Sequence, residues 1–113
     1  MDVEVYDRLV EAAKAGETVT YGELGEMLHL DFANPLARKK IGEVLGEISR
    51  FDVAAGRPML SSLVTHKDDF RPGTGFFKLG LELGLVRPDE DEMAFEIRQI
   101  KETWAAWEGA ASA

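Results

Sequence analysis

Cysteine is absent from the 113-residue sequence. Its absence excludes disulfide bonds, thiolate metal ligands and a cysteine nucleophile. No apolar run approaches the ~20 residues that span a bilayer. The opening residues, MDVEVYDRLV, lack the basic start and the apolar block of a secretory signal. We therefore expect a cytoplasmic protein with no membrane partner.

The composition is that of an ordinary soluble protein, with 45% hydrophobic and 30% charged residues. A chain of this length forms one modest core, so we expect a single domain over residues 1–108 and a frayed tail over 109–113. The net charge of −8 is unevenly distributed. Residues 30–80 hold eight basic and six acidic side chains, whereas the segments on either side carry −5 each. This pattern predicts one face that suits phosphate.

The first part of the chain has two helical patterns separated by a short strand. Apolar residues recur at helical spacing over residues 3–13, and Gly16 ends this predicted helix. The β-prone triplet TVT ends at Thr20 and predicts the strand. Thr20 also stands three residues before Glu23, which is the spacing of a capping box. The sequence therefore predicts a short second helix over residues 21–28.

Asn34 followed by Pro35 predicts the start of a third helix, which we expect to end near Arg50. The asparagine side chain caps the helix, and the missing N–H of proline costs nothing at its first position. Gly42 and Gly46 lie one turn apart, and we expect them to let another backbone approach closely. The predicted apolar stripe of this helix consists of Leu36, Ile41, Val44, Leu45 and Ile48.

The second half of the chain starts with an apolar, β-branched segment. MLSSLVTHK, at residues 59–67, predicts a strand. DDFRPGTG, at residues 68–75, predicts a loop, and residues 76–83 predict a short helix that ends at Gly84. The acidic residues 89–92 mark the start of a last helix, where the helix dipole favours negative charge.

The last helix has an apolar stripe at steps of four and three residues. We expect Ile97 and Ile100 to lie in the core of this chain. Trp104 and Trp107 lie near the chain end, where little of the same chain remains to cover them. We assign these two tryptophans to a partner-binding surface, partly shared with a second copy of the chain or with another protein. The alternative is that both belong to the core. The full stripe is Met93, Ile97, Ile100, Trp104 and Trp107.

The predicted order of elements is typical of a winged helix, which is a helix-turn-helix variant. We predict an α+β fold, mainly helical, with an added C-terminal helix. In such folds the N-terminal residues of the second helix of the pair enter the major groove. Here these residues run from Asn34 to Lys40 and include three adjacent cations, Arg38, Lys39 and Lys40, which suit phosphates and base edges. The alternative interpretation of the cations is a solvated helix face.

The segments TYGELGEML and ARKKIGEVLGEI resemble the DNA-binding domain of the alkylguanine-DNA alkyltransferases and their alkyltransferase-like relatives. The resemblance covers residues 18–65. It implies that Tyr21 presses on the target phosphate. It also places Lys39 at the position of the family's arginine finger, when the glycine that follows is aligned with Gly42. Judged from the residues alone, Tyr21 has an alternative role in packing on the first helix.

The active site of that family, Pro-Cys-His-Arg, falls at residues 60–63, which read LSSL. Without the reactive cysteine, alkyl transfer is excluded. The remainder of the chain departs from that family. Its segment KDDFRPGTGFF resembles small uncharacterised bacterial and phage proteins with a KDxxRPGxGFF pattern, and this resemblance implies no activity.

A catalytic interpretation of the loop rests on His66, Asp68 and Asp69. One histidine and two carboxylates can serve as acid and base or hold a metal, although aspartates in such a loop are more often turn formers. The RPGTG segment from Arg71 to Gly75 offers backbone N–H groups to an anion. It lacks the lysine and the spacing of a P-loop, and a wing or a tight surface loop is the alternative.

Taken together, these patterns predict a non-enzymatic protein that binds double-stranded DNA in a regulatory or damage-sensing role, without metal or cofactor. The alternative is a protein-interaction module of a bacterial or phage system, because repulsion between DNA and a chain of charge −8 opposes association. A hydrolase built on His66 ranks last. The predicted nucleic-acid contacts are Tyr21, Asn34, Arg38, Lys39, Lys40, Lys67 and Arg71.

Overall fold

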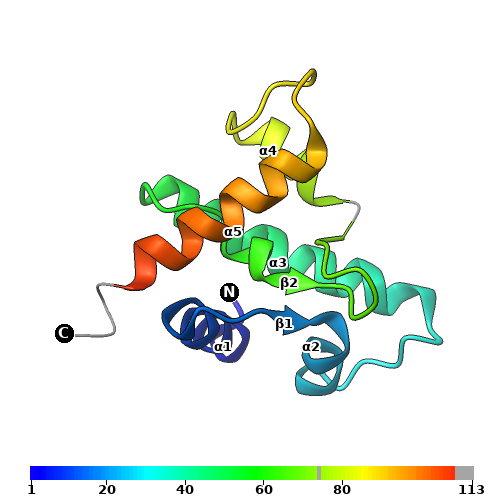
Figure 1. The fold of residues 1–113 in the computed structure, drawn as a ribbon. Helices are drawn as coiled ribbons and strands as arrows, with labels where there is room; N and C mark the ends of the chain where they lie inside the picture. The colour runs from blue at the N-terminus through cyan, green and yellow to red at the C-terminus, as the bar shows by residue number, and fades with distance from the viewer. Residues whose placement is uncertain (74, 109–113) are drawn as a thin grey trace.

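The computed structural model describes residues 1–73 and 75–108, so the predicted tail over 109–113 lies outside it. The described chain is mainly helical with a small two-stranded sheet, which confirms the α+β class (Figure 1). No helix within it is both long enough and apolar enough to cross a bilayer. The elements in chain order are α1 (Val3–Ala15), β1 (Val19–Thr20), α2 (Tyr21–Met27), α3 (Pro35–Ala54), the 3-10 helix η1 (Leu60–Leu63), β2 (Val64–Thr65), α4 (Gly75–Glu82) and α5 (Glu92–Glu108).

The predicted boundaries of the first three helices follow from local caps. Gly16 ends α1 in the left-handed conformation, with φ of 69°. The side chain of Thr20 accepts a hydrogen bond from the N–H of Glu23 (3.1 Å). The side chain of Asn34 accepts a hydrogen bond from the N–H of Leu36 (3.0 Å). These caps confirm the predicted starts of α2 and α3. The end of α3 differs, because the buried carboxylate of Asp52 is held by neighbouring side chains and the helix continues past Arg50.

The two strands pair in parallel, with Val19 opposite Val64 and Thr20 opposite Thr65. They lie side by side in the middle of the molecule (Figure 1). Each is only two residues long. The pair therefore contributes little stability as a sheet, but it sets where α2 and the loop after β2 begin.

The strand predicted over residues 59–67 is wrong for most of its length. Leu60–Leu63 form the 3-10 helix η1, all four residues are buried, and only Val64–Thr65 are extended. The reason is the polar pair in its middle. The hydroxyl of Ser61 accepts a hydrogen bond from the hydroxyl of Ser49 on α3 (2.7 Å). The hydroxyl of Ser62 forms a hydrogen bond with that of Thr103 on α5 (3.2 Å). A tight turn directs these two neighbouring side chains to different helices.

The main core forms around η1. Helices α1, α3 and α5 enclose it, as the ribbon shows (Figure 1). Of the predicted stripe on α3, Leu36 is exposed, whereas the other four residues are buried. The buried members of this core are Val5, Leu9, Ala12, Ala13, Val19, Leu24, Ile41, Val44, Leu45, Ile48, Leu60, Leu63 and Val64.

A second, smaller core joins α4 to α5. It consists of Met59, Phe76, Val86 and Phe95. The rings of Phe76 and Phe95 lie with their centroids 5.3 Å apart. Gly80 makes this packing possible, because a Cβ there would stand 2.6 Å from the ring of Phe95 and 3.2 Å from Val86.

The first two residues of the apolar stripe predicted for α5 lie away from the core. Met93 and Ile97 are 48% and 46% exposed, so the prediction that Ile97 is a core residue is wrong. The buried face instead carries Phe95, Gln99 and Thr103, together with Glu96. Polar groups of η1 and its flanks need partners, and this face supplies them: Gln99 accepts a hydrogen bond from the N–H of Met59 (3.0 Å). Three members of the predicted stripe, Ile100, Trp104 and Trp107, are partly buried against the main core.

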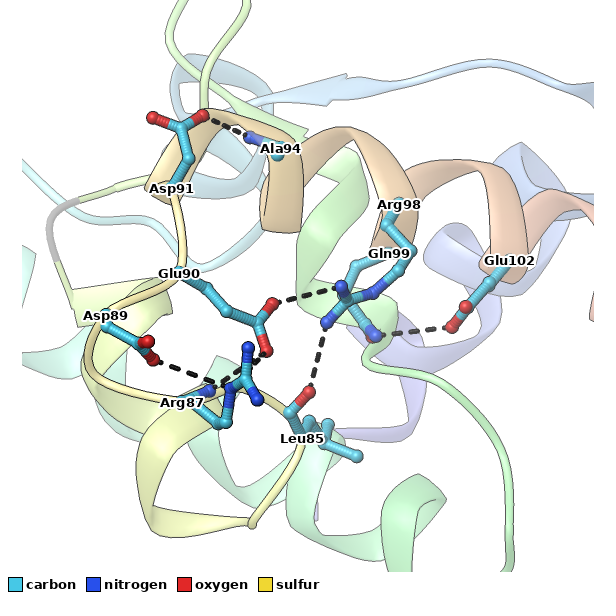
Figure 2. A network of polar contacts seen from close by, with 9 residues as sticks. All are labelled: Leu85, Arg87, Asp89, Glu90, Asp91, Ala94, Arg98, Gln99 and Glu102. Carbon is cyan, nitrogen blue, oxygen red and sulfur yellow. Dashed lines mark hydrogen bonds and ion pairs between the residues drawn. The ribbon is translucent and has the colours of Figure 1, made fainter.

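Ion pairs and caps fix the connection between α4 and α5 (Figure 2). Asp91 accepts a hydrogen bond from the N–H of Ala94 (2.9 Å), which caps α5. Arg98 donates to the carboxylate of Glu90 (3.1 Å) and to the carbonyl of Leu85 (3.1 Å). The Arg98 hydrogen bond is the main reason why the pKa of Glu90 lies below its ordinary value.

The two glycines Gly80 and Gly42 provide a test of the second core. Gly80→Ala should lower the free energy of unfolding by about 1–2 kcal/mol, because overpacking at Phe95 costs ~1–3 kcal/mol and the gain in helix propensity is at most ~1 kcal/mol. Gly42→Ala is the matched control, since nothing lies within 4 Å of a Cβ built there. It should raise stability by about 0.5–1 kcal/mol. Urea denaturation measures both, and stabilisation by Gly80→Ala would contradict this packing.

Candidate nucleic-acid interface

An open groove of about 600 Å³ lies between α2, α3, the loop after β2 and α4. Its lining includes the aromatic side chains of Tyr21, Phe32 and Phe76, together with the buried Ser61 of η1. The volume is in the range of sites that hold small organic ligands. The groove is therefore large enough for a nucleotide-sized group.

One row of α3 forms a wall of the groove. Arg38, Gly42, Gly46 and Arg50 follow one another at steps of four residues, and all line it. The two glycines leave the middle of the row without side chains. The expectation that Gly42 allows another backbone to approach is wrong, because nothing lies within 4 Å of a Cβ built there. Gly42 leaves open space next to Arg38, whereas the guanidinium of Arg50 lies over Gly46, 2.9 Å from a Cβ built there.

The lining of the groove is basic in an otherwise acidic chain. Arg38, Arg50, Lys67 and Lys78 contribute positive charge from three elements, and Glu82 is the one acidic side chain among the lining residues. Glu82 pairs with Arg50 (3.1 Å). Arg38, Lys67 and Lys78 form no ion pair with any residue that the structure describes. The groove therefore concentrates positive potential where the surface is concave.

The three predicted cations of α3 are exposed at its start. Arg38 lines the groove, whereas Lys39 and Lys40 lie outside the lining. Asn34 is also exposed, but its side-chain oxygen caps the helix by accepting the N–H of Leu36. The structure therefore brings Arg38 together with Lys67 at the groove. The side chain of Asn34 instead serves as the N-cap of α3.

Tyr21 joins α2 to the loop after β2. Its hydroxyl accepts a hydrogen bond from the N–H of Gly73 (2.8 Å), and its ring lies on that of His66, with centroids 4.7 Å apart. A side chain at residue 73 would collide with the tyrosine hydroxyl, so the approach requires glycine. Burial raises the pKa of Tyr21, and the Gly73 N–H opposes that shift.

Arg71 ties the same loop to α5. Its guanidinium donates two hydrogen bonds to the buried carboxylate of Glu96, at 2.8 and 2.9 Å. This pairing is the main cause of the raised pKa of Arg71. A bidentate pair of this kind fixes geometry as well as charge. Arg71 therefore holds the loop in place, and Lys67 is the cation that the loop contributes to the groove.

The residues considered for catalysis are engaged in the structure of the loop. Asp69 accepts a hydrogen bond from the N–H of Arg71 (2.9 Å), as expected of a turn-forming aspartate. His66 stacks on Tyr21, and Asp68 is exposed. The residues that the structure describes contain no cluster of three or more histidine or carboxylate side chains suited to a metal ion.

The two tryptophans of α5 pack on their own chain. The indole N–H of Trp104 donates to the carbonyl of Glu17 (3.0 Å). Trp107 lies edge-on to Tyr6 (6.5 Å between centroids), and the guanidinium of Arg57 stands 5.5 Å from its ring. Both side chains are only partly buried, and their role in partner binding stays a prediction.

Sequence reasoning missed Phe32, Arg50 and Lys78 as groove residues. A signal for Arg50 was present, because it continues the four-residue spacing of Arg38, Gly42 and Gly46. Phe32 and Lys78 belong to other segments, and only the tertiary arrangement brings them to the groove. Ser61, which belongs to the LSSL segment, also lines the groove.

Comparison with known proteins finds no matching family model, no matching curated protein and no matching solved structure. The resemblance to the alkyltransferases thus rests on the residues quoted above.

The tyrosines provide a test of the geometry that shapes the groove. Tyr6 and Tyr21 are the only two in the chain, and the pKa of each is raised, mainly by burial. The stability that these shifts provide should be fully present below pH ~10, the ordinary tyrosine pKa, and should be lost as pH rises through the folded-state values. Ultraviolet titration should therefore show tyrosinate forming above pH ~10.

Tyr21→Phe should remove one of the two ionisations and make stability fall less steeply at alkaline pH. It should also cost about 1 kcal/mol at neutral pH, because the N–H of Gly73 loses its partner. Thermal melts over a pH series measure both effects. Ionisation of Tyr21 at or below pH ~10 in the folded protein would show that its ring is not buried against the loop.

Proposed function

We propose that the protein is a non-catalytic DNA-binding protein of the winged-helix type. The observation that carries the proposal is the convergence of Arg38, Lys67 and Lys78 on one groove in a chain of net charge −8. No ion pair within the described chain accounts for the position of these three cations. It suits a ligand with several phosphates.

The position of α3 supports this assignment. Its first turns present Arg38, Lys39 and Lys40 to solvent, where they can neutralise phosphates and release counterions. Negative charge elsewhere on the chain opposes long-range attraction to DNA. We therefore expect binding that is weak and strongly dependent on salt.

The order of elements supports the winged-helix classification. Two helices separated by a turn, α2 and α3, are followed by β2 and by a loop that contributes Lys67 to the groove. In this proposal the loop takes the place of the wing, beside the basic helix. The resemblance to alkyltransferase-like proteins supports a role in sensing damage or in regulation, since Ser61 cannot act as their cysteine does.

A second candidate function, binding of another protein, is favoured by a separate observation. Met93 and Ile97 lie one turn apart on α5, and nearly half of each side chain is exposed. An exposed apolar pair of this kind suits a protein partner or a second copy of the chain. That contact would use α5, not the groove, so the two candidates can be separated by substitution.

The basic residues at the start of α3 provide the test of DNA binding. Replacing Arg38, Lys39 and Lys40 together with alanine should abolish binding to a labelled DNA duplex in low salt. For about three phosphate contacts, the slope of log K against log salt should be about −3 in the unmodified protein. Fluorescence anisotropy measures both quantities.

The matched control replaces three other exposed cations, Lys14, Arg87 and Lys101, with alanine. Both variants lower the net charge by three, so a general electrostatic effect would weaken binding equally. The proposal requires that the control variant binds far better than the α3 variant. Equal loss in the two, or no binding at high micromolar protein, would contradict it.

A further inference from the structure

Phe70 is the most exposed large apolar side chain of the described residues, at 71%. It is also one of two described non-glycine residues with positive φ, at 55°. Both features are unfavourable. The exposed ring forgoes the free energy that burial of apolar surface provides, and a positive φ is uncommon for a bulky residue. An exposed and strained aromatic residue in an ordered loop indicates a binding role.

The loop holds Phe70 in this position by hydrogen bonds. The N–H of Phe70 donates to the carbonyl of His66 (2.9 Å), and the N–H of His66 donates to the carbonyl of Arg71 (2.8 Å). Beyond Phe70, the Arg71–Glu96 pair anchors the loop to α5, and the bond from Gly73 to Tyr21 anchors it to α2. Phe70 is therefore presented outward by a loop that is tied at both ends, which lowers the entropy cost of binding.

The charges around Phe70 indicate which part of a nucleic acid it meets. Asp68 and Asp69 precede it directly and repel phosphate, so its ring suits the face of a base. The cations that suit phosphates lie in the groove. Phe70 is not one of its lining residues, but His66 and Lys67 before it and Gly73 after it in the same loop are. Phe32, 40% exposed, adds a second aromatic surface within that groove.

The size of the groove limits the form of the nucleic acid. About 600 Å³ accommodates a nucleotide-sized group. An unpaired base can enter a hollow of this size, whereas the bases of an intact duplex stay stacked and paired and would first have to be extruded. A groove with cations for the backbone and aromatic rings for the bases is the arrangement that binds unpaired strands.

We propose that the groove and the Phe70 loop bind a single-stranded segment of nucleic acid. Phe70 stacks on a base, while Arg38, Lys67 and Lys78 contact its phosphates. This inference rests on the proposed function and names the form of DNA that the same surface prefers.

The test compares a labelled oligothymidylate with the same strand annealed to its complement, by fluorescence anisotropy on the full chain. The single strand should bind about tenfold more tightly than the duplex. Phe70→Ala should weaken binding of the single strand by about tenfold, as expected for the loss of one stacked base. Phe70→Trp should retain the affinity, and its fluorescence should be quenched by the bound strand.

The matched control is Phe51→Ala, which removes another exposed phenylalanine that lies near the end of α3, outside both the groove lining and the Phe70 loop. It should leave both affinities unchanged, and thermal melts should show that all variants fold. Equal affinity for the two forms of DNA, or indifference to Phe70→Ala, would overturn this inference. In that case duplex binding that depends on Arg38, Lys39 and Lys40 would leave the proposed function standing, whereas absence of binding to either form would overturn both.

Discussion

The arrangement of the whole chain depends on burying the four-residue turn Leu60–Leu63. Its two leucines belong in the core, but the two serines between them carry polar groups that must find partners away from water. Ser61 forms a hydrogen bond with Ser49 on α3, and Ser62 forms one with Thr103 on α5. Because an unsatisfied buried polar group costs ~1–3 kcal/mol, these pairs restrict how α3 and α5 can pack around the turn.

The same constraint explains the polar face of α5. The side chain of Gln99 accepts a hydrogen bond from the N–H of Met59. The hydroxyl of Thr103 donates to the carbonyl of Gln99 (2.7 Å) and also forms a hydrogen bond with the hydroxyl of Ser62. Turning this face inward leaves Met93 and Ile97 in solvent. The helix thus exposes apolar surface at its start so that the polar groups of the buried turn gain partners, and the hydrophobic pattern alone is wrong for that part of the helix.

The parts of the fold that could be predicted from the sequence are those governed by neighbours along the chain. Caps at Thr20 and Asn34 and the left-handed Gly16 act within one helical turn, so the starts and ends they set were foreseen. The 3-10 turn was not, because LSSL followed by VTHK has the composition of a strand, and only its contacts with α3 and α5 favour a turn. For the same reason the cations of α3 were foreseen, whereas Lys78 in the groove was not.

The groove follows from the register of the two short strands. Thr20 pairs with Thr65, so the residues that directly follow the two strands, Tyr21 at the start of α2 and His66 in the loop, come close together and their rings stack. Tyr21 then holds Gly73, which closes the loop against α2. A shift of one residue in the register would separate the two rings and turn the side chains of β2 to the opposite face. The main role of the two short strands is thus to position the loop that carries Lys67 and Phe70, so that Lys67 and Arg38 line the same groove.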